Sequence, residues 1–375
     1  MKIFVVGPIY PFRGGIAHSN RILCENLGRN HEVTAISFSR MYPRFLYPGR
    51  GQKEANLDPR FKVKTEYSLD SLNPLSWRRA AGRIRNEQPD RVIFQWWHTF
   101  FLPMYWALAR WGRNPRTQFG IVCQNVLPHE NSELHERLTR TFFNLSDYFV
   151  ALSSSDLKLL NSLVSGKPAR WITECTYESQ FAQMPPRSAA RTKLGLQGDV
   201  LLFFGFVRPY KGLMFLLRAM PQILRARPDL TLMIVGEFWK DKAMYSDLIA
   251  ELSIGSHVMI VDRYVGNDEV PLYFAATDAV VLPYVSSSES GIIQLAYGMN
   301  VPIITTSVGG NVDLIVHETT GILCRPESPD ALARAVIDFY GRHMETRIRA
   351  GMRANAGLFQ WTADKEAAVL NTEER

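Results

Sequence analysis

The sequence contains few cysteines and no long apolar run. Its four cysteines are scattered, without the spacing of a disulfide framework or a metal site. We expect each to be a small buried residue in a reducing, cytoplasmic compartment. No apolar run reaches the ~20 residues of a membrane-spanning helix, and the apolar stretch within residues 1–8 is too short for a secretory signal. We therefore expect neither a disulfide-rich secreted domain nor a membrane-spanning protein.

The best-known phosphate-binding motifs are also missing. The chain has neither a P-loop nor a G-x-G-x-x-G fingerprint, so any phosphate site must be built in another way. It has no low-complexity tract, and its 46% hydrophobic and 21% charged residues are typical of a soluble globular protein. At 375 residues the chain is long for one domain and fits two of moderate size.

Positive charge is concentrated in the first half of the chain. Residues 1–185 hold 24 Lys and Arg against 15 Asp and Glu, whereas residues 186–375 hold 19 against 21. A basic half suggests contact with something anionic. No nucleic-acid-binding module is recognisable, so we expect no nucleic-acid partner. An anionic membrane surface, a phosphorylated acceptor and an ordinary solvated surface all remain open.

Short apolar segments alternate with segments of helical period, which predicts βαβ units and parallel sheets. The expected strands cover residues 2–7, 32–37, 61–67, 91–96, 118–124, 147–152, 200–206, 230–236, 258–261, 279–283 and 301–306. The expected helices include 15–27, 74–86, 102–111, 132–144, 212–225, 240–252, 290–299, 329–340 and 344–354. Residues 177–197 show little periodicity and form the candidate linker. Open α/β sheets bind ligands beyond the carboxyl ends of their strands, so we expect the functional residues in the loops that follow strands.

The most informative loop is residues 203–212, "FFGFVRPYKG". A strand stops at Gly205, and Arg208 and Lys211 follow just before a helix start. An Arg fork, a Lys point charge and the positive end of a helix dipole suit two adjacent phosphates of a nucleotide. Two exposed cations at a surface turn are the simpler alternative.

A second loop, residues 283–293, surrounds one carboxylate with small residues. The backbone N–H groups of Ser290 and Gly291 can hold a phosphate oxygen, and Glu289 can accept hydrogen bonds from sugar hydroxyls. Alternatively, Ser288 or Glu289 merely caps the following helix.

The first half offers its own loops after strands. Gly14 and Gly15 stand at a helix start where backbone can approach a ligand, although a plain tight turn fits equally well. His129 beside Glu130 follows an expected strand and suits a general acid/base or acceptor-binding pair. His98 ends another strand and is equally compatible with a structural role.

These segments together resemble a GT-B fold glycosyltransferase, specifically the retaining glycosyltransferase family 4 (glycosyl transferases group 1). The resemblance covers nearly the whole chain. Its N-terminal part is "GPIYPFRGGIAHSNRILCENLGRNHEV". Its C-terminal part is "LLFFGFVRPYKGLMFLLRA", "LMIVGE", "ATDAVVLPYVSSSESGIIQLAYGMNVPIITTSVGGNVDLI" and "GILCRPESPDALARAV", in that order.

The resemblance implies a nucleotide-diphosphate sugar donor held mainly by the C-terminal domain and a carbohydrate or lipid-linked acceptor held by the N-terminal one. No further cofactor and no metal are implied. The donor-binding residues would be Gly15, Gly205, Arg208, Lys211, Glu289, Ser290 and Gly291. The acceptor-binding residues would be Gly14, His98, His129 and Glu130. Catalysis would rest on Arg208, Lys211, Glu289 and His129, with the two cations stabilising the departing diphosphate.

Two departures from the family pattern stand out. The family carries two Glu residues separated by seven positions, and here Ser287 and Leu295 occupy these places. Glu289 is then the nearest carboxylate, with Gln294 second. The family's His after the fifth strand aligns with Gln124. A catalytically impaired GT-B scaffold, acting as a nucleotide-sugar-binding or assembly subunit, is therefore the alternative function.

The tail "FQWTADKEAAVL" resembles the terminal helix that packs back on the N-terminal domain in GT-B enzymes. We expect domains at 1–182 and 183–355, with 356–375 as that helix. The basic and aromatic stretches "MYPRFLYPGRGQK" and "SWRRAAGRIR" suit an anionic membrane interface. This predicts a cytoplasmic protein of bacterial-type polysaccharide biosynthesis, peripheral to the inner face of the membrane.

Overall fold

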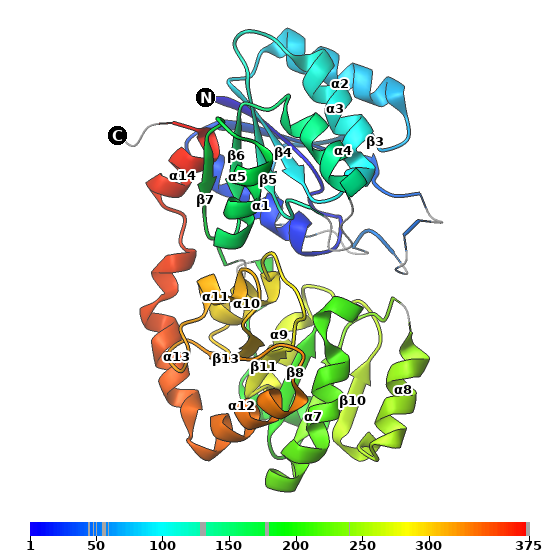
Figure 1. The fold of residues 1–375 in the computed structure, drawn as a ribbon, viewed down its shortest axis with the longest axis vertical. Helices are drawn as coiled ribbons and strands as arrows, with labels where there is room; N and C mark the ends of the chain where they lie inside the picture. The colour runs from blue at the N-terminus through cyan, green and yellow to red at the C-terminus, as the bar shows by residue number, and fades with distance from the viewer. Residues whose placement is uncertain are drawn as a thin grey trace. The chain divides into compact units, whose positions relative to one another are not determined.

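The computed structural model divides the chain into two compact units. The N-terminal unit comprises Met1–Cys175 and Trp361–Arg375, and the C-terminal unit comprises Thr176–Gln360. The structure describes residues 1–43, 46–47, 49, 51–54, 58, 60–127, 133–176, 180–239 and 241–372. Each unit is an α/β fold built on one parallel sheet (Figure 1), which confirms the predicted fold class.

The N-terminal sheet has the strand order β3-β2-β1-β4-β5-β6-β7, counted over the described residues. Its strands are β1 Lys2–Val6, β2 Glu32–Arg40, β3 Thr65–Asp70, β4 Arg91–Trp96, β5 Gln118–Cys123, β6 Tyr148–Ala151 and β7 Ala169–Trp171. Its helices are α1 Gly15–Leu27, α2 Pro74–Glu87, α3 Leu102–Gly112, α4 Glu133–Phe143, α5 Ser154–Leu163 and α14 Ala363–Leu370, with a 3₁₀ turn η1 at Thr99–Phe101. Alternate residues of β1 face opposite sides, as a strand requires. Phe4 and Val6 pack with α2, α3 and α4, whereas Ile3 and Val5 pack with α1 and α14.

The C-terminal sheet has the order β10-β9-β8-β11-β12-β13 within the described part. Its strands are β8 Val200–Phe204, β9 Thr231–Val235, β10 Val258–Val261, β11 Ala279–Leu282, β12 Ile303–Thr306 and β13 Ile322–Cys324. Its helices are α6 Arg187–Leu194, α7 Leu213–Ala226, α8 Lys242–Glu251, α9 Val270–Ala276, α10 Gly291–Gly298, α11 Asn311–Leu314, α12 Pro329–Gly341 and α13 Met344–Ala354. Three 3₁₀ turns complete the unit: η3 Pro209–Lys211, η4 Gly255–His257 and η5 Ala356–Phe359. In both sheets the first strand of the unit is central, and the strand order reverses beside it.

The predicted linker over 177–197 is wrong in its second half, because Arg187–Leu194 form helix α6. Arg191 on this helix donates to Asp278 Oδ1 at 2.8 Å, and Ala190 is fully buried. A short amphipathic helix with many cations gives little periodic signal, so the segment resembled a connection. The three-residue strands β7 and β13 were missed for a similar reason.

The C-terminal segment completes the core of the N-terminal unit. Val369 and Leu370 are buried there, and their backbone oxygens accept hydrogen bonds from Tyr148 Oη at 2.9 Å and Arg91 Nε at 2.6 Å. The chain therefore crosses between the units twice, near residues 175 and 360.

Candidate functional site

The candidate donor site lies at the carboxyl end of β8 and β11. These neighbouring strands flank the point where the strand order reverses, which is where open α/β sheets bind ligands. The loop after β8 carries Gly205, Arg208 and Lys211, and the loop after β11 carries Glu289, Ser290 and Gly291. The topology thus brings together six residues that were predicted as donor-binding.

The two loops are joined directly. Val285 N donates to Tyr210 O at 2.8 Å. Gly212 has φ 68°, and a side chain there would clash with the backbone oxygen of Pro283. Only glycine fits such a left-handed position against another backbone. The "KG" pair of the sequence therefore places Lys211 at the junction of both loops.

Lys211 is a buried cation that has no acidic partner within the part of the chain that the structure describes. The residue is only 9% exposed to solvent. The ammonium lies 5.6 Å from the centre of the Tyr284 ring. A Cβ at Gly205 would come within 2.8 Å of Lys211 Nζ, so a glycine there leaves room for the ammonium. Among the described residues no carboxylate lies within 4.0 Å of that ammonium, since every ion pair found there involves other cations.

The surroundings of the Lys211 ammonium change its pKa. Burial, with a further contribution from Arg208, lowers the pKa of Lys211 to about 8. A buried ammonium is unfavourable unless it is paired. The site therefore favours an anionic ligand that would replace the missing partner.

Arg208 is half-buried, and its guanidinium lies between two aromatic rings. Its central carbon is 5.2 Å from the Tyr210 ring centre and 5.1 Å from that of Trp239. Sequence reasoning placed Arg208 here but missed Trp239, which follows β9 and lies far along the chain. Tyr210 also forms a side-chain hydrogen bond with Arg208, and the other N–H groups of the guanidinium can bind an anion.

On the other loop, Ser290 is the N-cap of α10 but makes no capping bond with its side chain. Its hydroxyl donates instead to Tyr284 Oη at 3.3 Å. Gln294 is fully buried, and its Nε2 donates to Glu289 Oε1. The Gln294 Oε1 atom has no hydrogen-bond partner in the described structure. Gln294 thus holds the Glu289 carboxylate at the start of α10.

The acceptor-side candidates belong to the N-terminal unit. Gly14 is the N-cap of α1 with φ 103°, and Gly15 is exposed, with open space where a Cβ would lie. His98 is exposed at the end of β4, and its Nδ1 accepts from Phe100 N at 3.0 Å. The proton of neutral His98 therefore sits on Nε2. His129 and Glu130 lie outside the described residues.

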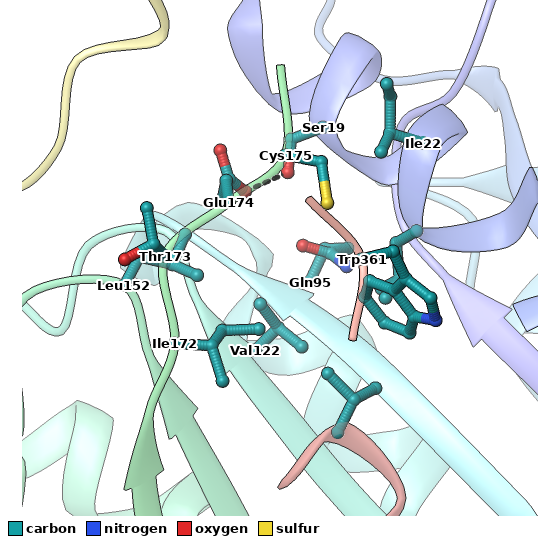
Figure 2. Close-up of a pocket in the computed structure, with 12 residues that line it drawn as sticks. Ser19, Ile22, Gln95, Val122, Leu152, Ile172, Thr173, Glu174, Cys175 and Trp361 are labelled. Carbon is teal, nitrogen blue, oxygen red and sulfur yellow. Dashed lines mark hydrogen bonds between the residues drawn. The ribbon is translucent and has the colours of Figure 1, made fainter. Parts of the chain in front are cut away.

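A polar cluster that the sequence analysis missed lies at the carboxyl end of the N-terminal sheet (Figure 2). Gln124 Nε2 lies 3.0 Å from Ser19 Oγ and 3.1 Å from both Gln95 Oε1 and Glu174 Oε1. Ser19 also donates to Glu174 (dashed in Figure 2). Burial raises the pKa of Glu174, against the opposing effect of these hydrogen bonds. Glu174 was missed because it follows the unpredicted strand β7.

This cluster borders a cavity of about 30 Å³, which Trp361 also lines. A buried water needs roughly 10–15 Å³, so there is room for one or two waters but not for a sugar. A larger hollow of about 740 Å³ lies beside the end of β2, lined by residues including Phe12, Tyr42, Tyr47 and Lys53. Volumes of ~300–1,000 Å³ are typical of small-molecule sites.

Helix α2 carries the basic stretch "SWRRAAGRIR", which was predicted to bind an anionic membrane. Arg78, Arg79 and Arg85 are exposed on this helix, and Leu75 is 64% exposed. Arg83 instead pairs with Glu66 and Glu87. No helix within the described parts of the chain is both long and apolar enough to cross a bilayer. The same parts contain no group of three or more His, Cys, Asp or Glu side chains placed to hold a metal ion.

Comparison with known proteins supports the fold of the whole chain. Residues 198–342 match the family model of glycosyl transferases group 1. A solved structure of Anabaena HepE in complex with UDP superimposes with a TM-score of 0.75 at 17% identity, covering 98% of this chain and 100% of that one. At this identity the likeness establishes the fold alone, which is GT-B.

Curated relatives match over part of their length. A D-inositol 3-phosphate glycosyltransferase of Streptomyces scabiei is 31% identical over 213 residues, 52% of this chain and 48% of that protein. An uncharacterized glycosyltransferase of Methanocaldococcus jannaschii is 35% identical over 150 residues, 39% of this chain and 37% of that protein. The matches therefore span half or less of the length of these two relatives.

Proposed function

The chain is a GT-B protein whose C-terminal unit carries the glycosyl transferases group 1 region, and from this premise we propose that it is a glycosyltransferase. It transfers a sugar, such as a hexose, from a nucleotide-diphosphate sugar to a carbohydrate or lipid-linked carbohydrate acceptor. The observation that carries the proposal is the buried ammonium of Lys211 beside Arg208, which pairs with no carboxylate among the described residues. Two fixed cations at the switch point of a parallel sheet suit the diphosphate of such a donor.

The remaining donor contacts follow from the same loops. The backbone N–H groups at Ser290 and Gly291 face a phosphate oxygen at the start of α10. Glu289, held by Gln294, accepts hydrogen bonds from sugar hydroxyls and replaces the missing second Glu of the family pattern. The Anabaena neighbour was also solved with UDP-glucose, which supports a UDP-sugar as the first donor to test and leaves GDP-sugars as the next.

The reaction needs stabilisation where charge develops. When the glycosidic bond to the donor breaks, negative charge grows on the departing diphosphate. Lys211 and Arg208 interact more strongly with this charge than with the intact donor, so they lower the barrier. We propose that the reaction needs no metal ion, because these cations fill that role, and that it retains the anomeric configuration.

The acceptor is proposed to bind the N-terminal unit. The hollow beside β2 combines the aromatic faces of Tyr42 and Tyr47 with the exposed ammonium of Lys53. Lys53 Nζ lies 4.9 Å from the centre of the Phe12 ring, and Phe12 precedes the Gly14–Gly15 loop. Aromatic faces and a cation suit a sugar that carries a phosphate. His98, His129 and Glu130 remain the candidate acid–base and hydroxyl-binding groups.

The enzyme is proposed to work in the cytoplasm, at the inner face of the membrane, in polysaccharide or glycoconjugate synthesis. The exposed arginines of α2 and the apolar Leu75 beside them support this location. Anionic lipids attract such a cluster, and an exposed leucine can enter the headgroup region.

A nucleotide-sugar-binding scaffold without catalysis is the second candidate. The observation that favours it is Gln124, at the position where the family carries His. Its amide is already engaged by Ser19, Gln95 and Glu174. A carboxamide neither gains nor loses a proton near neutral pH, so this position offers no general acid or base.

A screen of UDP-, GDP- and ADP-sugars separates these functions. Thermal stabilisation by one donor class measures binding, and slow release of free sugar from that donor measures bond breakage. We expect both for the enzyme and stabilisation alone for the scaffold. No stabilisation by any donor, or by UDP and GDP themselves, would contradict both.

A further inference from the structure

The guanidinium of Arg208 lies over two aromatic rings from different segments. Tyr210 lies in the same turn, whereas Trp239 follows β9. Both ring centres are just over 5 Å from the guanidinium carbon, at 5.2 Å and 5.1 Å. This distance is within the ~6 Å of a cation–π contact. The two rings therefore restrict the positions that the guanidinium can take.

Trp239 is itself held in place by the loop that it supports. Val207 N donates to Glu237 O at 3.0 Å, which ties the loop after β8 to the loop after β9. Gly236 has φ 149°, and a side chain there would clash with the backbone of Gly205. Phe206 packs on Trp239 with ring centres 4.7 Å apart. The indole and the guanidinium thus belong to one rigid assembly.

The ring contacts continue to the second cation. The Tyr210 and Tyr284 ring centres are 6.3 Å apart, and Lys211 Nζ lies 5.6 Å from the Tyr284 ring. A connected series of rings and cations, which we call the aromatic ladder, therefore follows the carboxyl edge of β9, β8 and β11. It consists of Phe206, Trp239, Arg208, Tyr210, Tyr284 and Lys211.

We propose that Trp239 is a positioning residue for the candidate donor site, acting through Arg208. The inference rests on the proposed function of Arg208 as a diphosphate ligand. An arginine side chain loses substantial rotamer freedom when it is fixed on a ligand. Trp239 removes that freedom beforehand and aims the N–H edge of Arg208 at the anion, so less entropy is lost on binding.

Simple core packing is the alternative explanation of the Trp239 contact, and the exposure of the pair argues against it. Trp239 and Arg208 are both half-buried, unlike the fully buried core residues Phe203 and Val235. A core role would place the indole among aliphatic side chains. Here one of its faces is covered by a cation instead.

A double-mutant cycle on inorganic pyrophosphate binding tests the proposal, because this probe carries neither base nor sugar. We expect Trp239→Leu to weaken binding about tenfold and Trp239→Phe, which keeps an aromatic face, to weaken it less than threefold. In an Arg208→Met background, Trp239→Leu should have no further effect, because the residue through which it acts is gone. Trp111→Leu, at a tryptophan 42% exposed in the N-terminal unit, is the matched control and should change nothing.

Two outcomes overturn the proposal while leaving the proposed function intact. One is that Arg208→Met abolishes binding but Trp239→Leu does not weaken it. The other is that Trp239→Leu weakens binding equally with and without Arg208, which would indicate a general structural effect. If the unaltered protein, with all its cations, binds neither pyrophosphate nor any nucleoside diphosphate, the proposed function itself fails. Turnover on a donor adds a second readout: Trp239→Leu should raise KM more than it lowers kcat.

Discussion

Among the residues that the structure describes, each unit has a buried cation near the first loop of its sheet, and the surroundings of the two cations differ. Arg21 on α1 is 3% exposed and pairs with Glu25 at 2.7 Å and Asp58 at 2.8 Å. Burial alone would lower the pKa of Arg21, but the hydrogen bonds that it donates to Asp58 and Glu25 outweigh this effect and raise that pKa. Lys211 is buried to a similar degree and has no carboxylate partner in the described structure, and its pKa falls.

The comparison distinguishes a structural cation from a ligand-binding one. A buried cation that is fully paired contributes to a rigid loop, and its removal leaves uncompensated charges. A buried cation without a partner lowers the stability of the empty protein, and a bound anion relieves that cost. Substitutions of Arg21 and of the donor-site cations should therefore have opposite effects on the stability of the empty protein.

Arg21→Met should destabilise the N-terminal unit by about 3 kcal/mol, because Glu25 and Asp58 would lose their shared partner, while Asp58 keeps its ion pair with Arg60. Urea unfolding measures this loss. Arg29→Met, at an exposed arginine of the same region, is the control and should stay within ~0.5 kcal/mol. Pyrophosphate binding should not change in either variant. If folded Arg21→Met protein bound pyrophosphate more weakly, Arg21 would not be a purely structural cation, and this prediction would be wrong.

Arg208→Ala should lower turnover on the donor by about 10²-fold, as expected when one electrostatic donor to a departing oxyanion is removed. Steady-state kinetics on the donor found in the screen measure this effect. Arg218→Ala removes an exposed arginine of α7 and should have no effect. Equal turnover of Arg208→Ala and the unaltered protein would rule out leaving-group stabilisation by Arg208.

Lys211→Met should raise the unfolding free energy of the empty protein at pH 7 by about 1–3 kcal/mol, because a buried charge is replaced by an apolar group. The same change should weaken pyrophosphate binding. The gain should shrink as the pH rises from about 8 towards 10.5, since native Lys211 then loses its own proton. A destabilised Lys211→Met protein would mean that the ammonium has a partner in solution.

Nucleoside diphosphate affinity should fall about tenfold per pH unit above pH 8. Only the ammonium form of Lys211 attracts the anion, and the terminal phosphate of a nucleoside diphosphate, with a pKa of about 6, is already ionised there. Calorimetry at pH 9 in buffers of different ionisation enthalpy should reveal proton uptake on binding. Lys211→Arg keeps its charge and should flatten the profile. A flat profile in the unaltered protein would exclude Lys211 as a ligand.

Arg78→Ala should weaken binding to vesicles that contain anionic lipids about fivefold at low salt, which corresponds to ~1 kcal/mol per arginine. Vesicle co-sedimentation measures the change. Arg334→Ala, at an exposed arginine of the C-terminal unit, is the control. If the unaltered protein does not sediment with these vesicles, the proposal that α2 binds an anionic membrane is contradicted.

The sequence predicted the fold well where period and length were both clear. The bounds of α1, β10 and α13 agree with the expected ranges. The elements β7, β13 and α6 have only three residues or few apolar positions. They therefore show no clear periodicity of apolar residues and were not predicted. At the candidate site, the positions of Arg208 and Lys211 after a strand were sufficient to predict a shared loop.

Features that depend on long-range contacts could not be predicted. No local pattern indicates that Lys211 lacks a carboxylate, because carboxylates from any part of the chain could have reached it. Trp239 covers Arg208 only because β9 lies next to β8. Glu174 meets Ser19 across 155 positions of the sequence. The roles of His129 and Glu130 stay predictions.

The insertion of residues 361–370 into the first sheet's core has a consequence for biosynthesis. Residues 361–370 follow the whole second unit in the chain, so the core of the first unit lacks the contacts of Val369 and Leu370 until the second unit has been synthesised. The unit whose synthesis starts first therefore cannot complete its core before the other unit has been made.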